Sequence, residues 1–421
     1  IMQAAFFKLA DVIPYEDADK YMKQYAKKTY GKKGDAIVQK NWDAIDIAIS
    51  GLKEVKVPAE WANAATGAEA IKIKNTTQHF DEVIAPILAQ EGDKLPVSAF
   101  NPAGVVPTGT TKYEKRGIAV KVPKWNIDKC IQCNQCSLVC PHAVIRPYLV
   151  DENAERPDSF AAKKAIGKEF AGKLFRIQIS PMDCTGCGNC VDVCPAKEKA
   201  LEMVPLHTQI AEEANWEFAQ TLPEVDPASV NKKTVKGSQF LKPLFEFSGA
   251  CAGCGETPYV KLVTQLFGDR MLIANATGCS SIYGGSAPTC PYTVNDKGQG
   301  PAWANSLFED NAEFGFGMNL ATNQRRAKLA DTVRKLIAVE WCAADIKEAG
   351  AEWLENMDDA EGSRKAGDKL LAACKAGIDL TGTEYEAKWI ENGKICDCDA
   401  CKLAREVIDS ADILGTDRKS V

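Results

Sequence analysis

Two cysteine runs with the same spacing constrain this chain more than any other feature. In each run, three cysteines are separated by two residues, and a fourth follows after three more, directly before a proline. The runs are Cys130, Cys133, Cys136, Cys140 and Cys184, Cys187, Cys190, Cys194. This spacing is typical of two [4Fe–4S] clusters, in which three close cysteines hold one cluster and the fourth ligates the other. We therefore expect one cluster on Cys130, Cys133, Cys136 and Cys194, and a second on Cys184, Cys187, Cys190 and Cys140.

A pair of zinc knuckles is the alternative interpretation of the two runs. Zinc binds four ligands in closed pairs and leaves the third cysteine and the Cys-Pro ends without a role. The runs instead favour a domain of the bacterial two-cluster ferredoxin type over residues 121–205, whose clusters pass single electrons. The long spacer between Cys140 and Cys184 predicts a helical insert over 159–174.

Composition restricts the function classes and the compartment. A length of 421 residues suggests about three domains. The net charge of −6 gives no electrostatic reason to expect nucleic acid, and no apolar run approaches the length of a membrane span. Seventeen cysteines cannot all pair in disulfides, and metal ligation suits a reducing compartment. We expect a cytoplasmic protein that binds neither nucleic acid nor membrane.

The N-terminal half divides by its periodicity and its prolines. Residues 1–57 predict two amphipathic helices, over 16–30 and 35–52, as the C-terminal tail of a preceding α/β domain. Residues 58–120 and 206–246 are rich in proline and are expected to be linkers.

From residue 247 the pattern changes to that of a second folded domain. A helical stripe over 256–267 is followed by a short apolar strand over 271–274, which indicates an α/β layer. A helix is expected over 320–340, and helical sequence continues to residue 421. The predicted fold class is therefore a multidomain chain of α+β and α/β parts.

A third cysteine site lies in this last part. Cys251 and Cys254 form a lone C-x2-C pair, and Cys279 follows in a glycine-rich turn. A redox dithiol, a zinc site and a third cluster all fit this spacing. The fourth ligand is open on spacing alone, with Cys290, Cys396, Cys398 and Cys401 as the available thiols.

Several longer segments carry a resemblance to a known family. The segments are Cys251-Ala-Gly-Cys-Gly-Glu256, Ala276-Thr-Gly-Cys-Ser-Ser-Ile-Tyr-Gly-Gly285, Pro291-Tyr-Thr-Val-Asn-Asp-Lys-Gly-Gln-Gly300, Pro107-Thr-Gly-Thr-Thr-Lys-Tyr-Glu-Lys-Arg116 and Tyr30-Gly-Lys-Lys-Gly34. Together they resemble pyruvate:ferredoxin oxidoreductase. The resemblance implies that residues 247–421 are the N-terminal part of a thiamine-diphosphate-binding α/β domain, and that residues 1–57 end a domain associated with coenzyme A.

The resemblance also implies roles for individual residues. Cys251, Cys254 and Cys279 would hold a third [4Fe–4S] cluster whose fourth ligand lies outside this chain. Glu256 and Cys279 would contact thiamine diphosphate, and Asn41 would be a weaker candidate for coenzyme A. The residues also allow simpler roles: a carboxylate favoured at a helix N-terminus for Glu256, a solvated helical residue for Asn41, and a small buried thiol for Cys279.

The chain departs from this family in one respect that bears on catalysis. The family binds Mg²⁺ and the diphosphate through a Gly-Asp-Gly segment, and no such segment occurs here. The chain also begins at Ile1 rather than Met. We expect a fragment truncated at both ends, with its catalytic residues and Mg²⁺ ligands in missing parts of the chain.

The resemblance leads to one function and leaves three alternatives. In the family, pyruvate and coenzyme A are converted to acetyl-CoA and CO₂, and electrons pass through three [4Fe–4S] clusters to ferredoxin or flavodoxin, in an enzyme expected to be a homodimer. The alternatives are a polyferredoxin-type carrier without catalysis, a relative acting on another 2-oxoacid, and a relative acting on NADP. His142, which follows Cys140-Pro141, is expected to pack beside a cluster rather than to exchange protons.

Overall fold

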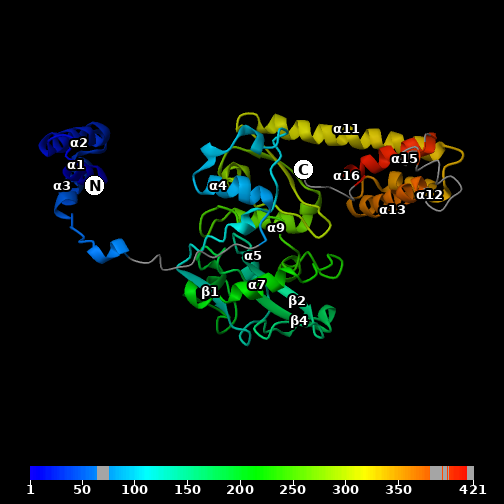
Figure 1. Cartoon of the computed structure of the whole chain (residues 1–421), viewed down its shortest axis with the longest axis horizontal. Helices are drawn as coiled ribbons and strands as arrows, with labels where there is room; N and C mark the ends of the chain where they lie inside the picture. Colours follow the sequence, from blue (N-terminus) through cyan, green and yellow to red (C-terminus); the bar gives the residue numbers. More distant parts are fainter. Residues whose placement is uncertain (64–74, 380–390, 392–395, 397, 415–421) are drawn as a thin grey trace. The chain divides into compact units, whose positions relative to one another are not determined.

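The computed structural model describes residues 1–63, 75–379, 391, 396 and 398–414. The chain divides into two compact units, Ile1–Lys72 and Ile73–Val421 (Figure 1). None of the described helices is both long and apolar enough to cross a membrane. Short 3₁₀ turns lie at Gly31–Lys33, Ala59–Asn63, Gly92–Lys94, Val97–Ala99, Thr111–Tyr113, Lys168–Phe170, Leu206–Thr208 and Gly268–Arg270.

The first unit is a small helical layer. It contains α1 (Met2–Ala10), α2 (Tyr15–Tyr30) and α3 (Asp35–Ser50). The two helices predicted from sequence are confirmed as α2 and α3, whereas α1 was not predicted. Ala4, Ile45 and Ala48 form a shared core, because one apolar stripe on each of α1 and α3 faces the other.

The two cysteine runs lie in a ferredoxin-like arrangement of strands and short helices. β1 (Lys121–Trp125) pairs antiparallel with β5 (Leu201–Pro205), so that Trp125 faces Leu201. Between them, β2 (Ile145–Asp151) pairs antiparallel with β4 (Lys173–Ile179). The first run contains α5 (Gln135–Leu138) and the second contains α6 (Asn189–Asp192). Each cysteine loop is therefore bracketed by strands of the same domain.

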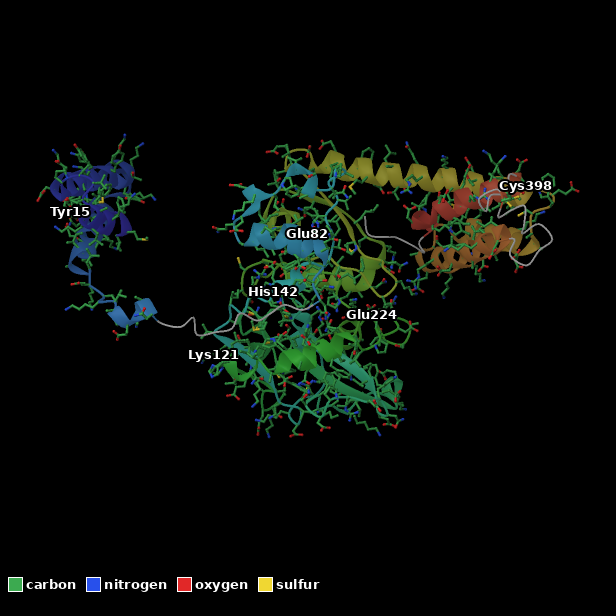
Figure 2. All side chains as sticks on the ribbon, viewed as in Figure 1. Tyr15, Glu82, Lys121, His142, Glu224 and Cys398 are labelled. Atoms are coloured by element: carbon green, nitrogen blue, oxygen red, sulfur yellow. The ribbon has the colours of Figure 1, made fainter. Side chains whose placement is uncertain are left out.

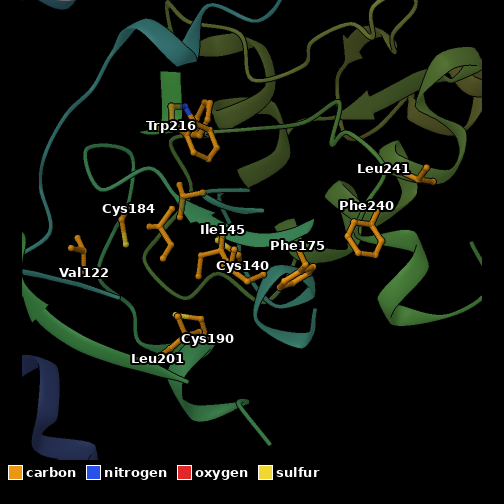
Figure 3. Packing of buried hydrophobic residues seen from close by; sticks show 14 of the residues in the cluster. Val122, Cys140, Ile145, Phe175, Cys184, Cys190, Leu201, Trp216, Phe240 and Leu241 are labelled. Carbon is orange, nitrogen blue, oxygen red and sulfur yellow. The ribbon is translucent and has the colours of Figure 1, made fainter. Parts of the chain in front are cut away.

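A single hydrophobic core underlies both runs. Figure 3 shows Val122, Ile145, Phe175 and Leu201 from the strands packed around the side chains of cysteines from both runs. Phe240 meets Phe175 edge-to-face with ring centroids 6.1 Å apart. The clusters would therefore lie against an apolar interior, and exclusion of solvent is one of the factors that set a cluster's reduction potential.

The predicted helical insert over 159–174 is wrong. These residues contain β3 (Lys163–Lys164), which pairs with β4, a 3₁₀ turn and the start of β4 itself. Gly167 and Gly172 have positive φ values of 136° and 76°, which interrupt any helix. Packing of Phe170 against Phe240 stabilises this hairpin, since their ring centroids lie 5.1 Å apart.

The two proline-rich segments contain buried side chains as well as turns. In 58–120, a π-helix (Phe80–Ile84) leads into α4 (Ala85–Leu88), and Phe80, Val83 and Ile84 are buried. In 206–246, α7 (Glu212–Gln220) buries Trp216 in the ferredoxin-like core, and α8 (Val235–Ser238) follows.

The α/β layer expected after residue 247 is present as a small parallel sheet. α9 (Thr257–Phe267) precedes β6 (Leu272–Ala276), and β6 pairs parallel with β7 (Ala302–Ser306). α10 (Cys279–Ser281) and a π-helix (Ile282–Ser286) connect them. Helix and strand therefore lie within two residues of their predicted bounds.

The remaining described residues form a helical bundle with its own core. α11 (Asn311–Ala338) begins nine residues before the helix predicted over 320–340 and ends two residues before its predicted end. It packs with α12 (Ala344–Asn356), α13 (Ala360–Ile378), α15 (Asp399–Asp409) and α16 (Ala411–Leu414) (Figure 1). Val333, Leu336, Trp353 and Leu370 are fully buried in this core. A separate helical core of this kind was not foreseen from the sequence, which predicted one α/β domain.

Candidate iron–sulfur centre

The two cysteine loops adopt the same backbone conformation. Gln132 and Asn134, two and four residues after Cys130, have φ values of 59° and 61°. Gly186 and Gly188, at the equivalent positions after Cys184, have φ values of 73° and 83°. The repeat seen in the sequence is therefore also a repeat of backbone geometry, as expected for two loops that each wrap one cluster.

Backbone N–H groups in these loops point at cysteine sulfurs. Three such contacts measure 3.4 Å, from Gln132 to Cys130, from Gly186 to Cys184 and from Ala200 to Cys194. N–H donors to the sulfur ligands stabilise negative charge on a cluster and thereby raise its reduction potential.

The two left-handed residues of the first loop bond through their side chains to backbone atoms outside the loop. Gln132 donates to Lys164 O at 2.9 Å and accepts from Ile166 N at 2.7 Å. Asn134 donates to Lys236 O at 2.9 Å. The insert and α8 thus fix a conformation that glycine adopts without help in the second loop.

The buried thiols of the two runs lie close to one another across the domain. Burial raises the pKa of Cys184 to about 12, and the neighbouring thiols of Cys140 and Cys187 act in the same direction. Burial and the nearby Cys140 also raise the pKa of Cys190. Cys140 therefore lies near thiols of both runs, because it also acts to raise the pKa of Cys136. Thiols of this kind lose their protons when a metal binds them.

A buried lysine fastens α9 to the first cysteine run. The Lys261 amine donates to Ser137 O, to Leu138 O at 3.1 Å and to Cys140 O at 3.3 Å. Burial lowers the pKa of Lys261 to about 8, so the amine remains mostly protonated at pH 7. It satisfies the carbonyls at the end of α5 and puts a positive charge beside the cluster ligands. Nothing in the spacing of the sequence indicated this contact.

The third cysteine loop is built at the N-terminus of α9. Burial acts to raise the pKa of Cys254, but the N–H groups of Thr257 and Glu256 outweigh it, and the pKa is lowered. A lowered pKa favours the thiolate, which is the form that binds metal. Cys254 is half-buried and Cys251 is exposed.

This third loop packs against the second cysteine run. Gly253 has a φ of 72°, and a Cβ placed on it would lie 3.6 Å from Cys187 Cβ and 3.8 Å from the Asn189 amide. His142, labelled in Figure 2, lies with its ring nitrogens 3.0 Å from Ser248 O and 3.3 Å from Cys251 O. His142 is therefore buried against the backbone of the third cysteine loop.

The segment entering the third loop is anchored to the ferredoxin-like part. Glu246 forms a buried ion pair with Arg146 of β2. Arg116 donates to the carbonyls of Phe247 and Ser248 at 3.4 and 3.3 Å. These contacts hold the segment before the third loop against β2 and the segment that precedes β1.

Cys279 lies beyond the carboxyl end of β6. It begins α10, three residues after the strand ends, and it is exposed. Thr277 Oγ1 donates to Ser306 O of β7 at 3.2 Å. Backbone beyond the carboxyl ends of parallel strands is where α/β sheets bind ligands.

A buried aromatic cluster, the aromatic wall, packs against the β6–β7 sheet. Phe245 packs against Tyr283 and Tyr292 with ring centroids 5.6 and 5.0 Å apart. Trp303 lies on the Gly284-Gly285 backbone, where a Cβ on Gly285 would clash with its ring at 2.2 Å. Within the part of the chain that the structure describes, Ser248 Oγ and Trp303 Nε1 are buried without a hydrogen-bond partner. Such orphaned polar atoms fit a wall to which a polar cofactor adds its own groups.

The other residues suggested by the resemblance lie as follows. Glu256 is exposed and precedes α9 without capping it through a side-chain hydrogen bond. Asn41, in the first unit, donates to Ile37 O of its own helix at 2.8 Å. Cys290 is half-buried, and its thiol points to Tyr292 O at 3.8 Å.

Three further cysteines form a group of their own. The sulfurs of Cys396, Cys398 and Cys401 all lie within 4.8 Å of one another in the helical bundle. From the sequence they were candidates only for the fourth ligand of the third site, and Cys401 is buried. Their C-x-C-x2-C spacing was the signal that could have identified the group.

Comparison with known proteins finds three matching family models. Residues 129–197 match a 4Fe-4S dicluster domain. Residues 325–379 match an insertion domain of pyruvate-ferredoxin oxidoreductase, and residues 68–119 match a domain of unknown function named EKR. The first model coincides with the two cysteine loops, and the second falls within the helical bundle.

Curated relatives match nearly the whole chain. A pyruvate:ferredoxin oxidoreductase from Moorella thermoacetica is 61% identical over 92% of this chain, and a pyruvate-flavodoxin oxidoreductase from Enterobacter agglomerans is 51% identical over 88%. A mitochondrial pyruvate dehydrogenase [NADP(+)] from Euglena gracilis is 47% identical over 88%. The chain spans 33%, 32% and 21% of the lengths of these relatives.

Proposed function

Because the chain is homologous over most of its length to a segment of the pyruvate:ferredoxin and pyruvate-flavodoxin oxidoreductases, we propose that it is the electron-transfer segment of such an enzyme. The proposed overall reaction oxidises pyruvate and coenzyme A to acetyl-CoA and CO₂ and releases two electrons. The observation that carries the proposal is the packing of the Cys251–Cys254 loop against Cys187 of the second run.

The proposed centres are three [4Fe–4S] clusters in a row. Two use the eight cysteines of the repeated runs with the crossed assignment, and the third uses Cys251, Cys254 and Cys279 with a fourth ligand from outside this chain. A cluster accepts one electron at a time, so a row of clusters lets a two-electron oxidation supply a one-electron carrier. The contact between Gly253 and Cys187 supports transfer from the third cluster to the second run.

Thiamine diphosphate is the proposed cofactor beside the third cluster. When bound, it supplies the carbanion chemistry that lets a 2-oxoacid lose carbon dioxide. Cys279 and Glu256 are the proposed contacts from this chain, and the aromatic wall of Phe245, Tyr283 and Trp303 would exclude water from the site. The Mg²⁺ ligands and the catalytic groups are proposed to lie in other parts of the enzyme.

Further proposals concern the electron acceptor, coenzyme A, the assembly and the domains. Ferredoxin or flavodoxin is the proposed acceptor, since those words occur in the names of the relatives from Moorella and Enterobacter. Asn41 is the proposed contact for coenzyme A, and the carbonyl of its side-chain amide remains able to accept a hydrogen bond after the amide donates to Ile37. A homodimer is the proposed assembly. We further propose residues 1–57 as the tail of the coenzyme A domain, and residues from 247 as part of the thiamine domain.

The second candidate function is that of an electron carrier without catalysis, which would need neither the third loop nor the aromatic wall.

The experiment that tests the proposed function is Cys279→Ala in the intact enzyme, with Cys342→Ala as a control thiol from the helical bundle. We expect Cys279→Ala to remove the third cluster's EPR signal and pyruvate-driven reduction of ferredoxin while the two ferredoxin-type signals persist. The control should keep all three signals. Full activity with three intact signals in Cys279→Ala would refute the assignment.

A further inference from the structure

The Cys396, Cys398 and Cys401 group has the dimensions of a site for one metal ion. Cys396 Sγ and Cys398 Sγ are 3.5 Å apart, and all three sulfurs lie within 4.8 Å of one another. A tetrahedral Zn²⁺ with Zn–S bonds of about 2.3 Å separates its sulfurs by about 3.8 Å. The three thiols therefore need only small adjustments to share such an ion.

Other uses of three close thiols fit less well. A disulfide has an S–S bond of about 2.05 Å and would leave the third thiol unpaired. Sulfurs around a four-iron cube bind four different irons and therefore lie farther apart than ligands of one ion. Within the described residues, this is the one group of three or more metal-binding side chains close enough to share an ion, and the eight ferredoxin-type cysteines do not form one.

The local structure favours negative charge on the Cys398 sulfur. Cys398 is the N-cap residue of α15, and its Sγ accepts a hydrogen bond from Cys401 N at 3.4 Å. Arg405, one turn later, donates to Cys396 O at 3.0 Å. Its other terminal nitrogen, Nη2, is buried with no partner among the described residues. Three thiolates with one divalent cation carry a net charge of −1, which the Arg405 guanidinium offsets.

An ion bound by these three cysteines would stabilise the start of α15. Cys401 is buried beside Ala404 and Val407, which join α15 to the core of α11, α12 and α13. Cys396 precedes α15, and Figure 2 labels Cys398 at this end of the bundle. An ion held by all three would tie the incoming chain to the first turn of α15. The half-buried Cys396 and Cys398 leave a side open for a fourth ligand.

We propose that Cys396, Cys398 and Cys401 bind a single thiophilic cation of the Zn²⁺ class, with water or another small donor as the fourth ligand. This site is independent of the proposed enzyme activity. It stabilises the start of α15, and it takes no part in electron transfer because Zn²⁺ has no accessible second oxidation state.

The test uses the full chain after anaerobic loading of its iron–sulfur clusters and removal of loosely held metal. Zn²⁺ is then added in competition with a chromophoric chelator. We expect one additional Zn²⁺ per chain, with three sulfur neighbours at about 2.3 Å in zinc-edge X-ray absorption. The triple variant Cys396→Ser, Cys398→Ser, Cys401→Ser should lose this zinc, and Cys342→Ala should keep it.

A single variant separates loss of the ion from loss of the fold. Cys396→Ser changes a half-buried residue outside α15, so helix content and iron content should be unchanged. Its zinc affinity should fall by more than about tenfold, since even loss of a neighbour of a ligand costs that much. Equal zinc binding in the parent and the triple variant would overturn the proposal, as would a parent chain that takes up no zinc beyond the competitor.

Discussion

At the scale of single residues, the two cysteine loops place different residue types at the same left-handed backbone positions. The second loop places Gly186 and Gly188 where the backbone is left-handed, and the first loop places Gln132 and Asn134 there. A left-handed conformation costs a typical non-glycine residue roughly 1–2 kcal/mol, and Asn less. Hydrogen bonds from the side chains of Gln132 and Asn134 to the backbone of the insert and of α8 offset that cost.

Asn134 allows this compensation to be tested. Asn134→Ala keeps a Cβ in the left-handed region and loses the bond to Lys236 O, whereas Asn134→Gly loses only the bond. We expect Asn134→Ala to destabilise the loaded domain by about 1–3 kcal/mol and Asn134→Gly by less. The rate of iron release to a chelator in guanidinium measures the difference. Equal release rates in the two variants would show that the backbone conformation carries no cost here.

Single residues could be predicted from the sequence where the spacing of cysteines indicates the metal centre that they bind. The spacing predicted all eight ferredoxin-type cysteines, and a family model of the 4Fe-4S dicluster type covers them. The contact of Lys261 with the first cysteine run was not predicted, because its partners, Ser137 to Cys140, are more than a hundred residues away in the chain. Only the packing of α9 on α5 brings them together, and no local pattern encodes such packing.

At the scale of elements, strong periodicity was a reliable guide and weak periodicity was not. The helices over 16–30, 35–52 and 256–267 and the strand at 271–274 are present within a few residues. The insert over 159–174 has an alanine- and lysine-rich start that favours helix, but pairing with β4 and burial of Phe170 override this preference. Its two glycines were the signal against a helix.

The contact between the third loop and the second run is the element-scale feature on which the proposed electron route depends. Gly253→Ala places a methyl group at a φ of 72° and against Cys187, whereas Gly249→Ala meets nothing within 4 Å. We expect Gly253→Ala to weaken the magnetic coupling between the third cluster and its neighbour in the intact enzyme, and Gly249→Ala to preserve it. EPR of the fully reduced enzyme measures the coupling. If Gly253→Ala leaves it unchanged, the loops do not define the route.

At the scale of the whole molecule, the chain corresponds to one segment of its longer relatives. Its 421 residues span about one third of the Moorella relative. The ferredoxin-like part, the two-stranded parallel sheet and the helical bundle each have a separate hydrophobic cluster. The bundle could not be foreseen as a separate core, because its helices follow the α/β layer without a proline- or glycine-rich break in the sequence.

We expect that this chain alone does not oxidise pyruvate. No Gly-Asp-Gly segment is present to hold Mg²⁺ and the diphosphate, so the negative charge of the cofactor would lack its cation. Supplied with thiamine diphosphate, Mg²⁺, pyruvate and coenzyme A, the loaded chain should reduce no viologen dye above background. Dithionite should still reduce its clusters, which serves as the positive control. Pyruvate-dependent dye reduction would place the catalytic groups within these residues.

The most direct test of the central claim is the metal content of the anaerobically reconstituted chain, read together with its EPR spectrum. Two clusters on the paired runs require about eight iron and eight sulfide per chain, firmly held through gel filtration. Their closeness requires a spin-coupled spectrum when both are reduced, and Cys140→Ser should destabilise only the cluster of the second run. A chain that takes up zinc on these eight cysteines and retains no iron would contradict the account.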